Sequence, residues 1–379
     1  MAERGPARIA LAGTGGYGGV HLANLRCLQE TRRTRLVAVC DVGPPPEAFA
    51  SWLQAEGVRQ FAELEPMLAE AAPDVTIIAT PPHLHPPMLR GAFAAGCDVL
   101  VEKPPVVTRT QLAAASAQAE GHRCQVGFQA LGSWAVARLR TLIASGDLGT
   151  VDLVAAGGCW IRGDRYYGRA RWAGRRTLDG EPVNDGALTN PFAHAVMGCL
   201  AIAGIDALEG AGVDADLYRA HPIEVHDTGA VRVRLPGRPT VLVAVTLCAG
   251  TRGEPWVLVR GTDGAARWDY LGDEIEITRG GGPPELERGP RSDLLENLLA
   301  VRDGEAPELI APLAKTRPFV ELVEEVSARP VRDVTAARRR ERTTDDGDRW
   351  PEIVGVEAAT ARAVVGGRLY EETGVTWSA

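Results

Sequence analysis

The sequence predicts an α/β protein in which an N-terminal, doubly wound parallel sheet precedes an α+β domain with an open, mostly antiparallel sheet. Over the first 128 residues, short apolar runs alternate with helical stretches, as in βαβ units. After about residue 130, longer runs alternate between apolar and polar residues, which is typical of antiparallel strands with one solvated face. We therefore place the first domain at residues 1–128 and the second at residues 129–379.

In the first domain, strands are predicted at five apolar runs, which cover residues 8–12, 36–40, 75–79, 99–101 and 124–126. Helices are predicted between them, where apolar residues recur at helical spacing, over residues 17–30, 61–72, 86–95 and 110–120. Right-handed crossovers would bring the carboxyl ends of all these strands to one edge of the sheet, where ligands bind in such folds.

In the second domain, a helix is predicted over residues 134–144. The strands that follow are expected at residues 152–160, 230–235, 240–247, 256–260 and 265–270. Two more helices are expected, over residues 292–301 and 354–370, the second weakened by Gly366 and Gly367. The charged, uneven stretch 329–350 reads as a solvated loop.

Composition narrows the class of protein. A net charge of −8 disfavours a nucleic-acid partner, and no apolar stretch is long enough to cross a membrane. Seven irregularly spaced cysteines favour neither a disulfide framework nor a metal site, and the start of the chain lacks a signal-peptide layout. We expect a cytoplasmic protein without a metal site. Of its 41 basic residues, only Lys103 and Lys315 are lysines.

A glycine turn joins the first predicted strand to the first predicted helix. Gly13, Gly15 and Gly18 fit the pattern G-x-G-x-x-G in the context that gives this pattern its meaning. The first glycine allows the tight turn, the second the approach of a pyrophosphate, and the third close packing of helix on strand. With Gly16 and Tyr17 they predict the phosphate site of a Rossmann fold, at the positive end of the helix dipole.

An acidic residue ends the second predicted strand. Asp41 follows Gly18 by 23 residues, close to where a Rossmann fold places a carboxylate on the adenosine ribose. A carboxylate there accepts hydrogen bonds from the ribose hydroxyls and repels a 2′-phosphate. No arginine follows directly, so the sequence favours NAD over NADP.

Two further segments end predicted parallel strands, Ala-Thr-Pro-Pro-His-Leu-His at 79–85 and Val-Glu-Lys-Pro-Pro at 101–105. With the glycine turn, in this order and near this spacing, they resemble the glucose-fructose oxidoreductase / inositol dehydrogenase / rhizopine-catabolism (Gfo/Idh/MocA) family. The resemblance covers the whole first domain. It extends into the second through Tyr166-Tyr167, Trp172, Asp179 and residues 186–194.

The resemblance implies a nicotinamide cofactor held partly by these strand ends, with contacts from Thr80, Pro81, His85, Glu102 and Lys103. It also implies that Lys103 points its ammonium to the junction of nicotinamide and substrate. A lysine beside a cationic nicotinamide and partly desolvated has a physical reason for a lowered pKa, and it can then transfer a proton or bind a carbonyl oxygen.

In the second domain, the family typically shows an aspartate and, four residues later, a histidine. The corresponding pair here is Asn190 and His194, which would share one face of a helix. The resemblance implies that His194 is the general base for a substrate hydroxyl. Asn190 departs from the aspartate and cannot be a base, but it can hydrogen-bond a sugar hydroxyl. Further substrate contacts are expected from Trp160, Arg162, Tyr166 and Tyr167.

The function that follows is NAD-dependent oxidation of a ring hydroxyl, or reduction of the ketone, in a sugar, nucleotide-sugar or cyclitol. Two alternatives stay open: an NAD-dependent glycosidase that retains its cofactor, and a non-catalytic sugar or NAD sensor. The apolar strands of the second domain would expose one face of the sheet, which favours a homodimer or homotetramer. His226-Asp227 resembles a fragment of a metal site, but nothing else in the sequence supports one.

Overall fold

The computed structural model describes residues 5–378 and divides the chain into two compact units. The first unit consists of Met1–Gly127 and Asp293–Ala314, and the second of Phe128–Ser292 and Lys315–Ala379. Among the described residues, every helix is too short or too polar to pass through a bilayer.

The first unit contains a parallel sheet of six strands within the described residues, in the order β3-β2-β1-β4-β5-β6. The strands are β1 (Ala7–Ala12), β2 (Thr34–Cys40), β3 (Arg59–Phe61), β4 (Val75–Ile78), β5 (Asp98–Val101) and β6 (Cys124–Val126). The helices are α1 (Tyr17–Glu30), α2 (Glu47–Ala55), α3 (Leu64–Ala71), α4 (His85–Ala94), α5 (Arg109–Gln118) and α9 (Leu294–Asp303), with a 3₁₀ turn at Pro82–Leu84. This confirms the predicted doubly wound Rossmann fold.

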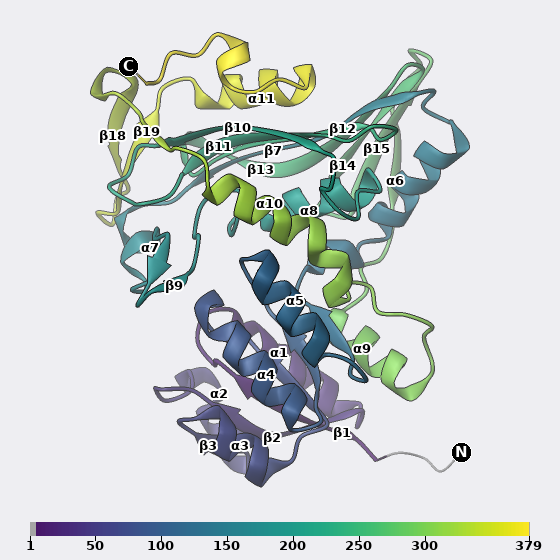
Figure 1. Ribbon diagram of the computed structural model, residues 1–379, viewed down its shortest axis with the longest axis vertical. Coiled ribbons are helices and arrows are strands. Elements are labelled where there is room, and N and C mark those ends of the chain that lie inside the picture. The colour runs from purple at the N-terminus through teal and green to yellow at the C-terminus, as the bar shows by residue number, and fades with distance from the viewer. Residues whose placement is uncertain (1–4, 379) are drawn as a thin grey trace. The chain divides into compact units, whose positions relative to one another are not determined.

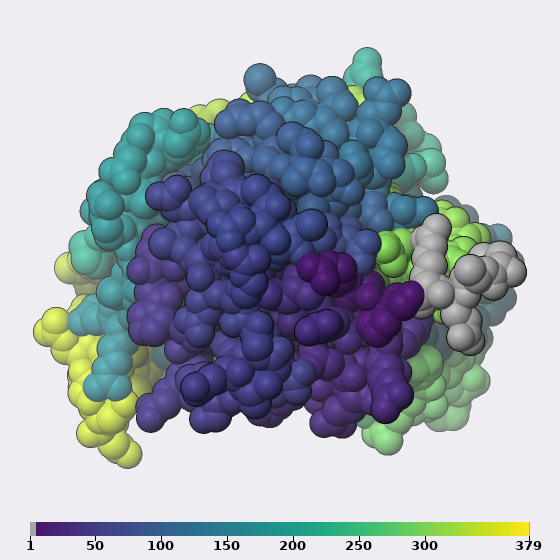
Figure 2. All heavy atoms as spheres, turned by 90° about the horizontal axis from the view of Figure 1, so that it is seen from below, coloured from purple at the N-terminus to yellow at the C-terminus, as the bar shows by residue number. Residues whose placement is uncertain are grey.

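Helices cover this sheet on two sides. Leucines of α1, α2 and α9 form one buried cluster with side chains of β1, β2, β4 and β5. The helices α3, α4 and α5 contact one another in a row (Figure 1). In Figure 2 the N-terminal residues of this unit, purple to blue, form a continuous surface. The strands of this sheet have mostly apolar sequences because they are buried. All four residues of β4 and all four of β5 are buried.

The second unit is built on a larger sheet, nine-stranded within the described residues, in the order β16-β15-β14-β13-β7-β12-β11-β10-β17. Neighbouring strands are antiparallel except in the pairs β7–β12 and β10–β17. The strands are β7 (Val151–Ile161), β10 (Gly212–Arg219), β11 (Thr228–Arg234), β12 (Thr240–Thr246), β13 (Cys248–Gly261), β14 (Gly264–Asp269), β15 (Glu274–Arg279), β16 (Glu285–Arg288) and β17 (Arg332–Asp333).

The other elements of this unit are short hairpins and helices. The hairpin strands are β8 (Thr177–Leu178), β9 (Glu181–Pro182), β18 (Arg339–Thr343) and β19 (Arg349–Ile353). The α-helices are α6 (Trp134–Ser145), α7 (Asp164–Gly168), α8 (Ala193–Ile202), α10 (Arg317–Ser327) and α11 (Val356–Gly366). Single 3₁₀ turns occur at Gln129–Gly132, Ala336–Arg338 and Glu371–Thr373, and a further one, Leu313–Thr316, includes the last residues of the first unit's segment.

The sheet of the second unit is covered on both faces at its centre. Both α8 and α11 contact β7, β12 and β13, and Figure 1 shows them on opposite sides. Because side chains alternate across a sheet, Ala155 and Leu242 pack with α11, Tyr370 and Trp377 in one core cluster. We expected one face of this sheet to be exposed. That expectation is wrong at the centre of the sheet, because the chain's own C-terminal segment covers that face.

The stretch 329–350 is also not the expected loop. It contains β17, a 3₁₀ turn and the hairpin β18–β19. All five residues of β18 are exposed, so that strand shows no apolar alternation in the sequence. The predicted helix at 354–370 is shorter, because Gly367 caps α11 in the left-handed conformation at φ 62°.

Candidate functional site

The glycine turn lies between β1 and α1 and leaves backbone open to a ligand. Gly13 has a φ of 86°, and a Cβ there would lie 2.6 Å from the carbonyl oxygen of Ala79. A Cβ on Gly18 would lie 2.1 Å from the Gly13 oxygen, so neither position can hold a larger residue. No atom lies within 4 Å of a Cβ built on Gly15 or Gly16. The amides at the start of α1 are therefore accessible, and this turn fits a pyrophosphate.

Asp41 is held at the tip of β2 by the same turn. Its Oδ2 accepts hydrogen bonds from the backbone N–H of Thr14 at 2.7 Å and from the Thr14 hydroxyl at 2.9 Å. Its Oδ1 has a longer bond of 3.3 Å, from the N–H of Gly43. Burial alone would raise the pKa of Asp41, but the bonds from Thr14 and Gly43 outweigh it and lower the pKa. The carboxylate is thus ionised and oriented by Thr14.

His85 fastens the loop after β4 to the loop after β5. Its Nε2 lies 2.8 Å from the carbonyl oxygen of Thr80, and its Nδ1 lies 2.8 Å from that of Pro104. The side chain is fully buried, and burial lowers its pKa. His85 therefore connects these two loops through both ring nitrogens, and its contact with a cofactor stays a prediction. Thr80 and the adjoining Pro81 remain partly exposed.

Glu102 and Lys103 follow β5 at the same edge of the sheet. Glu102 Oε1 lies 2.9 Å from Nε2 of His21 in α1, and both side chains are buried. Its Oε2 accepts the backbone N–H of Lys103 at 3.3 Å, and the Lys103–Pro104 peptide bond is cis. The ring of Tyr17 meets that of His21 edge-on at 5.4 Å. The contact between His21 and Glu102 thus fixes the lysine-bearing loop to the helix that opens with the glycine turn.

In the second unit, Asn190 and His194 lie near the start of α8. His194 is the second residue of that helix and lies partly exposed, with its ring 5.9 Å from that of Phe128. Asn190 lies in the preceding turn, where its N–H bonds to the carbonyl of Gly186. The expectation that both residues share one face of a helix is therefore wrong, because Phe192 caps the helix two residues after Asn190.

A buried carboxylate orients the Asn190 amide. Asp185 Oδ1 accepts Nδ2–H of Asn190 at 2.5 Å, while Oδ2 accepts the Gly174 N–H at 2.8 Å and Nη2–H of Arg169 at 3.2 Å. Burial raises the pKa of Asp185, and the contacts from Arg169, Asn190 and Gly174 oppose that rise. Since a carboxylate accepts and does not donate, the amide nitrogen faces Asp185 and the amide oxygen faces away from it.

Three of the four predicted aromatic and arginine contacts form one connected stack. The Arg162 guanidinium lies 5.1 Å from the ring centre of Trp160 and 5.0 Å from that of Tyr166. Arg169 continues the stack on the other side, 3.7 Å from Tyr166 and 4.6 Å from Trp172. Burial, followed by the charge of Asp185, raises the pKa of Tyr166 to about 12, so the phenol stays neutral. Such a stack offers aromatic faces beside fixed positive charge.

The side chain of Tyr167 is not part of this stack and lies against His221. Its ring lies 4.6 Å from that of His221, and its hydroxyl is enclosed without a hydrogen-bond partner among the described residues. Of the predicted substrate residues, it is the one directed toward a separate buried cluster. Sequence reasoning missed Thr14, Asp185 and the role of His21; the available signal for Asp185 was an acidic residue directly before a small, apolar stretch.

Comparison with known proteins relates part of the chain to a family of oxidoreductases. Residues 7–129 match the model of an oxidoreductase family with an NAD-binding Rossmann fold. The chain is 29% identical over 213 residues to the rhizopine catabolism protein MocA of Rhizobium meliloti, covering 50% of this chain and 64% of that protein. It is 30% identical over 152 residues to an inositol 2-dehydrogenase of Leifsonia xyli subsp. xyli, covering 38% and 42%. Each match spans less than two thirds of the relative.

Residues 7–129 thus match the Gfo/Idh/MocA family model, the family that the motifs resemble. Among solved structures, the WlbA dehydrogenase of Chromobacterium violaceum, in complex with NADH and UDP-GlcNAcA, has a TM-score of 0.71 at 23% identity, covering 93% of this chain and 98% of that one. A levoglucosan dehydrogenase, in complex with NADH and L-sorbose, has a TM-score of 0.70 at 17% identity, covering 85% and 96%. At these identities the similarity shows a shared fold in both units.

Proposed function

We propose that the protein is an NAD-dependent dehydrogenase that oxidises a ring hydroxyl of a sugar, nucleotide-sugar or cyclitol, or reduces the corresponding ketone, in the cytoplasm. The family match and the names of the relatives support this class of reaction. The observation that carries the proposal lies in the first unit. Its one lysine, Lys103, follows β5 at the carboxyl edge of the sheet, the edge where the glycine turn follows β1.

The first unit would hold the cofactor. The amides of Gly15, Gly16 and Tyr17 would bind the pyrophosphate, and Asp41 Oδ1, whose bond from Gly43 is long, would accept the ribose hydroxyls. When bound, the nicotinamide supplies the hydride chemistry. Lys103 would then hold the substrate oxygen and move a proton to or from it.

The second unit would hold the sugar. The hydroxyl proton would pass to His194 or to Lys103, and the amide oxygen of Asn190, directed away from Asp185, would accept a hydrogen bond from a neighbouring hydroxyl. The stack of Trp160 and Tyr166 about Arg162 would contact the ring or its anionic substituent.

A direct assay tests this function. The protein is incubated with NAD and a panel of free sugars, cyclitols and nucleotide-sugars, and NADH formation is followed by absorbance. We expect NADH to accumulate with one ring type. Release of a phenol from an aryl glycoside without added NAD would indicate the glycosidase instead. Binding of NADH and sugar with no turnover in either assay would indicate a sensor.

Asp41 should determine the preference of the protein for NAD over NADP. We expect Asp41→Asn to weaken NAD binding about tenfold or more, because a charge-assisted hydrogen bond is lost, and to reduce the preference over NADP. The lowered pKa of Asp41 also fixes the pH dependence. The contribution of Asp41 to the free energy of unfolding is present above the ordinary aspartate pKa, and it is lost as pH falls through the lower pKa of the folded state. Fluorescence titration with NADH and NADPH measures both affinities, with the exposed Glu47→Gln as control; equal affinities in Asp41→Asn and the wild type would contradict the role.

Asp185 should act through Asn190. We expect Asp185→Asn to raise KM about tenfold while NAD binding is unchanged, because the amide of residue 185 can no longer hold Asn190 in one orientation. Steady-state kinetics against substrate and NADH titration give the two readouts. Asp179→Asn, on an exposed acid of the same segment, is the matched control. An unchanged KM in Asp185→Asn would exclude this positioning role.

We also propose that the protein self-associates as a homodimer or homotetramer. Since α11 covers the centre of the larger sheet, the support lies at its edge. There, among residues 5–378, β16 has a neighbouring strand on one side only, and Leu286 is 58% exposed. Light scattering after size-exclusion chromatography measures the mass. A monomer at micromolar concentration would contradict the proposal.

A further inference from the structure

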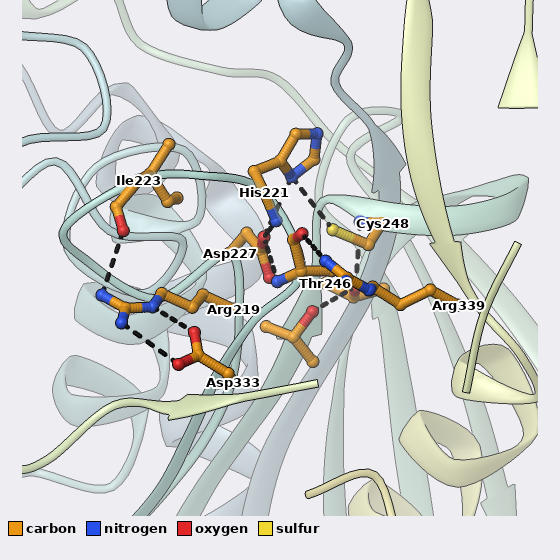
Figure 3. A network of polar contacts seen from close by, with 10 residues as sticks. Arg219, His221, Ile223, Asp227, Thr246, Cys248, Asp333 and Arg339 are labelled. Atoms are coloured by element: carbon orange, nitrogen blue, oxygen red, sulfur yellow. Dashed lines mark hydrogen bonds and ion pairs between the residues drawn. The ribbon is translucent and has the colours of Figure 1, made fainter. Parts of the chain in front are cut away.

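Three side chains with metal-binding atoms meet in the interior of the second unit (Figure 3). His221 follows β10, Asp227 directly precedes β11, and Cys248 begins β13. His221 Nδ1 lies 2.9 Å from Asp227 Oδ2 and 3.3 Å from Cys248 Sγ. The three residues are buried, with at most 4% of any of them exposed. They bring an imidazole, a carboxylate and a thiol from separate segments to one point.

Hydrogen bonds within the chain account for only part of this cluster. Asp227 Oδ2 accepts the backbone N–H groups of Ala220 and His221, at 2.8 Å each. Asp227 Oδ2 and Cys248 Sγ both contact the same ring nitrogen of His221, which can carry only one hydrogen. Asp227 Oδ1 and His221 Nε2 are buried and have no hydrogen-bond partner among the described residues. A buried polar atom without a partner is costly, so the cluster has lone pairs left to satisfy.

The same geometry argues against a nucleophilic triad. In such a triad, the nucleophile and the orienting acid bond to different ring nitrogens of the histidine. Here both partners lie at Nδ1, so His221 cannot relay a proton between Cys248 and Asp227. Three ligand atoms that bind one ion must lie close to one another, and here the carboxylate and the thiol both lie beside Nδ1 of His221.

We propose that His221, Asp227 and Cys248 bind a divalent transition-metal cation of the zinc type. Mixed sulfur, nitrogen and oxygen ligands suit zinc, whereas magnesium and calcium take oxygen ligands. In tetrahedral zinc sites, ligand atoms lie about 3.3 to 3.5 Å apart. The 3.3 Å between His221 Nδ1 and Cys248 Sγ falls in this range, and the 2.9 Å between Nδ1 and Asp227 Oδ2 is shorter. A thiolate and a carboxylate also balance the charge of a dication, so the buried site would be neutral.

A cavity borders this cluster at His221. His221 lines a cavity of about 600 Å³ together with Arg219, Asp333 and Arg339. Arg219 is paired with Asp333, and Arg339 donates to the carbonyl of Ala220, as Figure 3 shows. Asp227 and Cys248 do not line this cavity, so an ion would reach them past His221, and a water molecule would complete four-fold coordination. The bound cation would tie the turn between β10 and β11 to the start of β13. His226 takes no part, because its Nε2 accepts the Leu188 N–H.

Cobalt reports on the site without any nucleotide or sugar, so this test is separate from that of the proposed function. The full chain is stripped with a chelator and titrated with Co²⁺. We expect about one equivalent to bind, with a thiolate-to-cobalt charge-transfer band and the visible bands of tetrahedral cobalt. Zn²⁺ should displace the cobalt and raise the Tm of the stripped protein, and the chelator should reverse the rise.

Two variants locate the metal. Cys248→Ser should lose the charge-transfer band, and Cys124→Ser, on a buried cysteine of the first unit, should keep it. If Cys248→Ser does not fold, the titration and Tm shift of the wild type still decide. The absence of both in the wild type would overturn the proposal and leave a hydrogen-bonded cluster. A band that survives in folded Cys248→Ser would overturn it by placing the metal elsewhere.

Discussion

Lys103→Ala should lower kcat about a thousandfold, because the reaction loses the group that moves a proton at the substrate oxygen. The affinity for NADH should stay nearly unchanged, since the glycine turn and Asp41 lie on other strands of the sheet. Stopped-flow measurement of hydride transfer and fluorescence titration with NADH give the two values. Full activity in this variant would remove Lys103 from the mechanism.

The chain offers an unusually clean control for this experiment. Lys315, its only other lysine, is exposed, so Lys315→Ala should leave kcat unchanged. Lys103→Arg separates charge from proton transfer, because a guanidinium keeps the positive charge but does not deprotonate. We expect Lys103→Arg to remain as slow as Lys103→Ala. Recovery of most of the rate by arginine would mean that the lysine acts through its charge alone.

His194→Gln should lower kcat about a hundredfold, because glutamine can hydrogen-bond the hydroxyl but cannot accept its proton. Steady-state measurement of kcat, with His122→Gln as control, measures the effect. An unchanged kcat in His194→Gln would show that another group is the base.

The first unit could be predicted in detail because its strands are buried on both faces. The runs at 75–79 and 99–101 have no polar surface to interrupt them, and they match β4 and β5 closely. The strand β3 and the helix α2 escaped prediction. Two of the three residues of β3 are exposed, and α2 follows three prolines that read as a turn.

The second unit was harder to predict, because its polar residues are partly internal. Strand β10 includes the buried Asp216, whose carboxylate pairs with Arg332, so its sequence lacks simple alternation. The orientation of Asn190 likewise depends on Asp185, Gly174 and Arg169, which a local pattern does not connect. Thr14 is of the same kind: its place in the glycine turn was evident, but its bonds to Asp41 depend on the pairing of β1 with β2.

The return of Asp293–Ala314 to the first unit has a consequence for biosynthesis. Four leucines of α9 complete the core beneath β5 and β6, yet the ribosome makes them about 170 residues after β6. At ordinary translation rates this delay is about ten to thirty seconds. During that time the nascent nucleotide-binding unit lacks one of its covering helices and exposes an apolar patch, which is the kind of surface that chaperones bind. A protein that ended at Gly127 would keep that patch permanently and should aggregate.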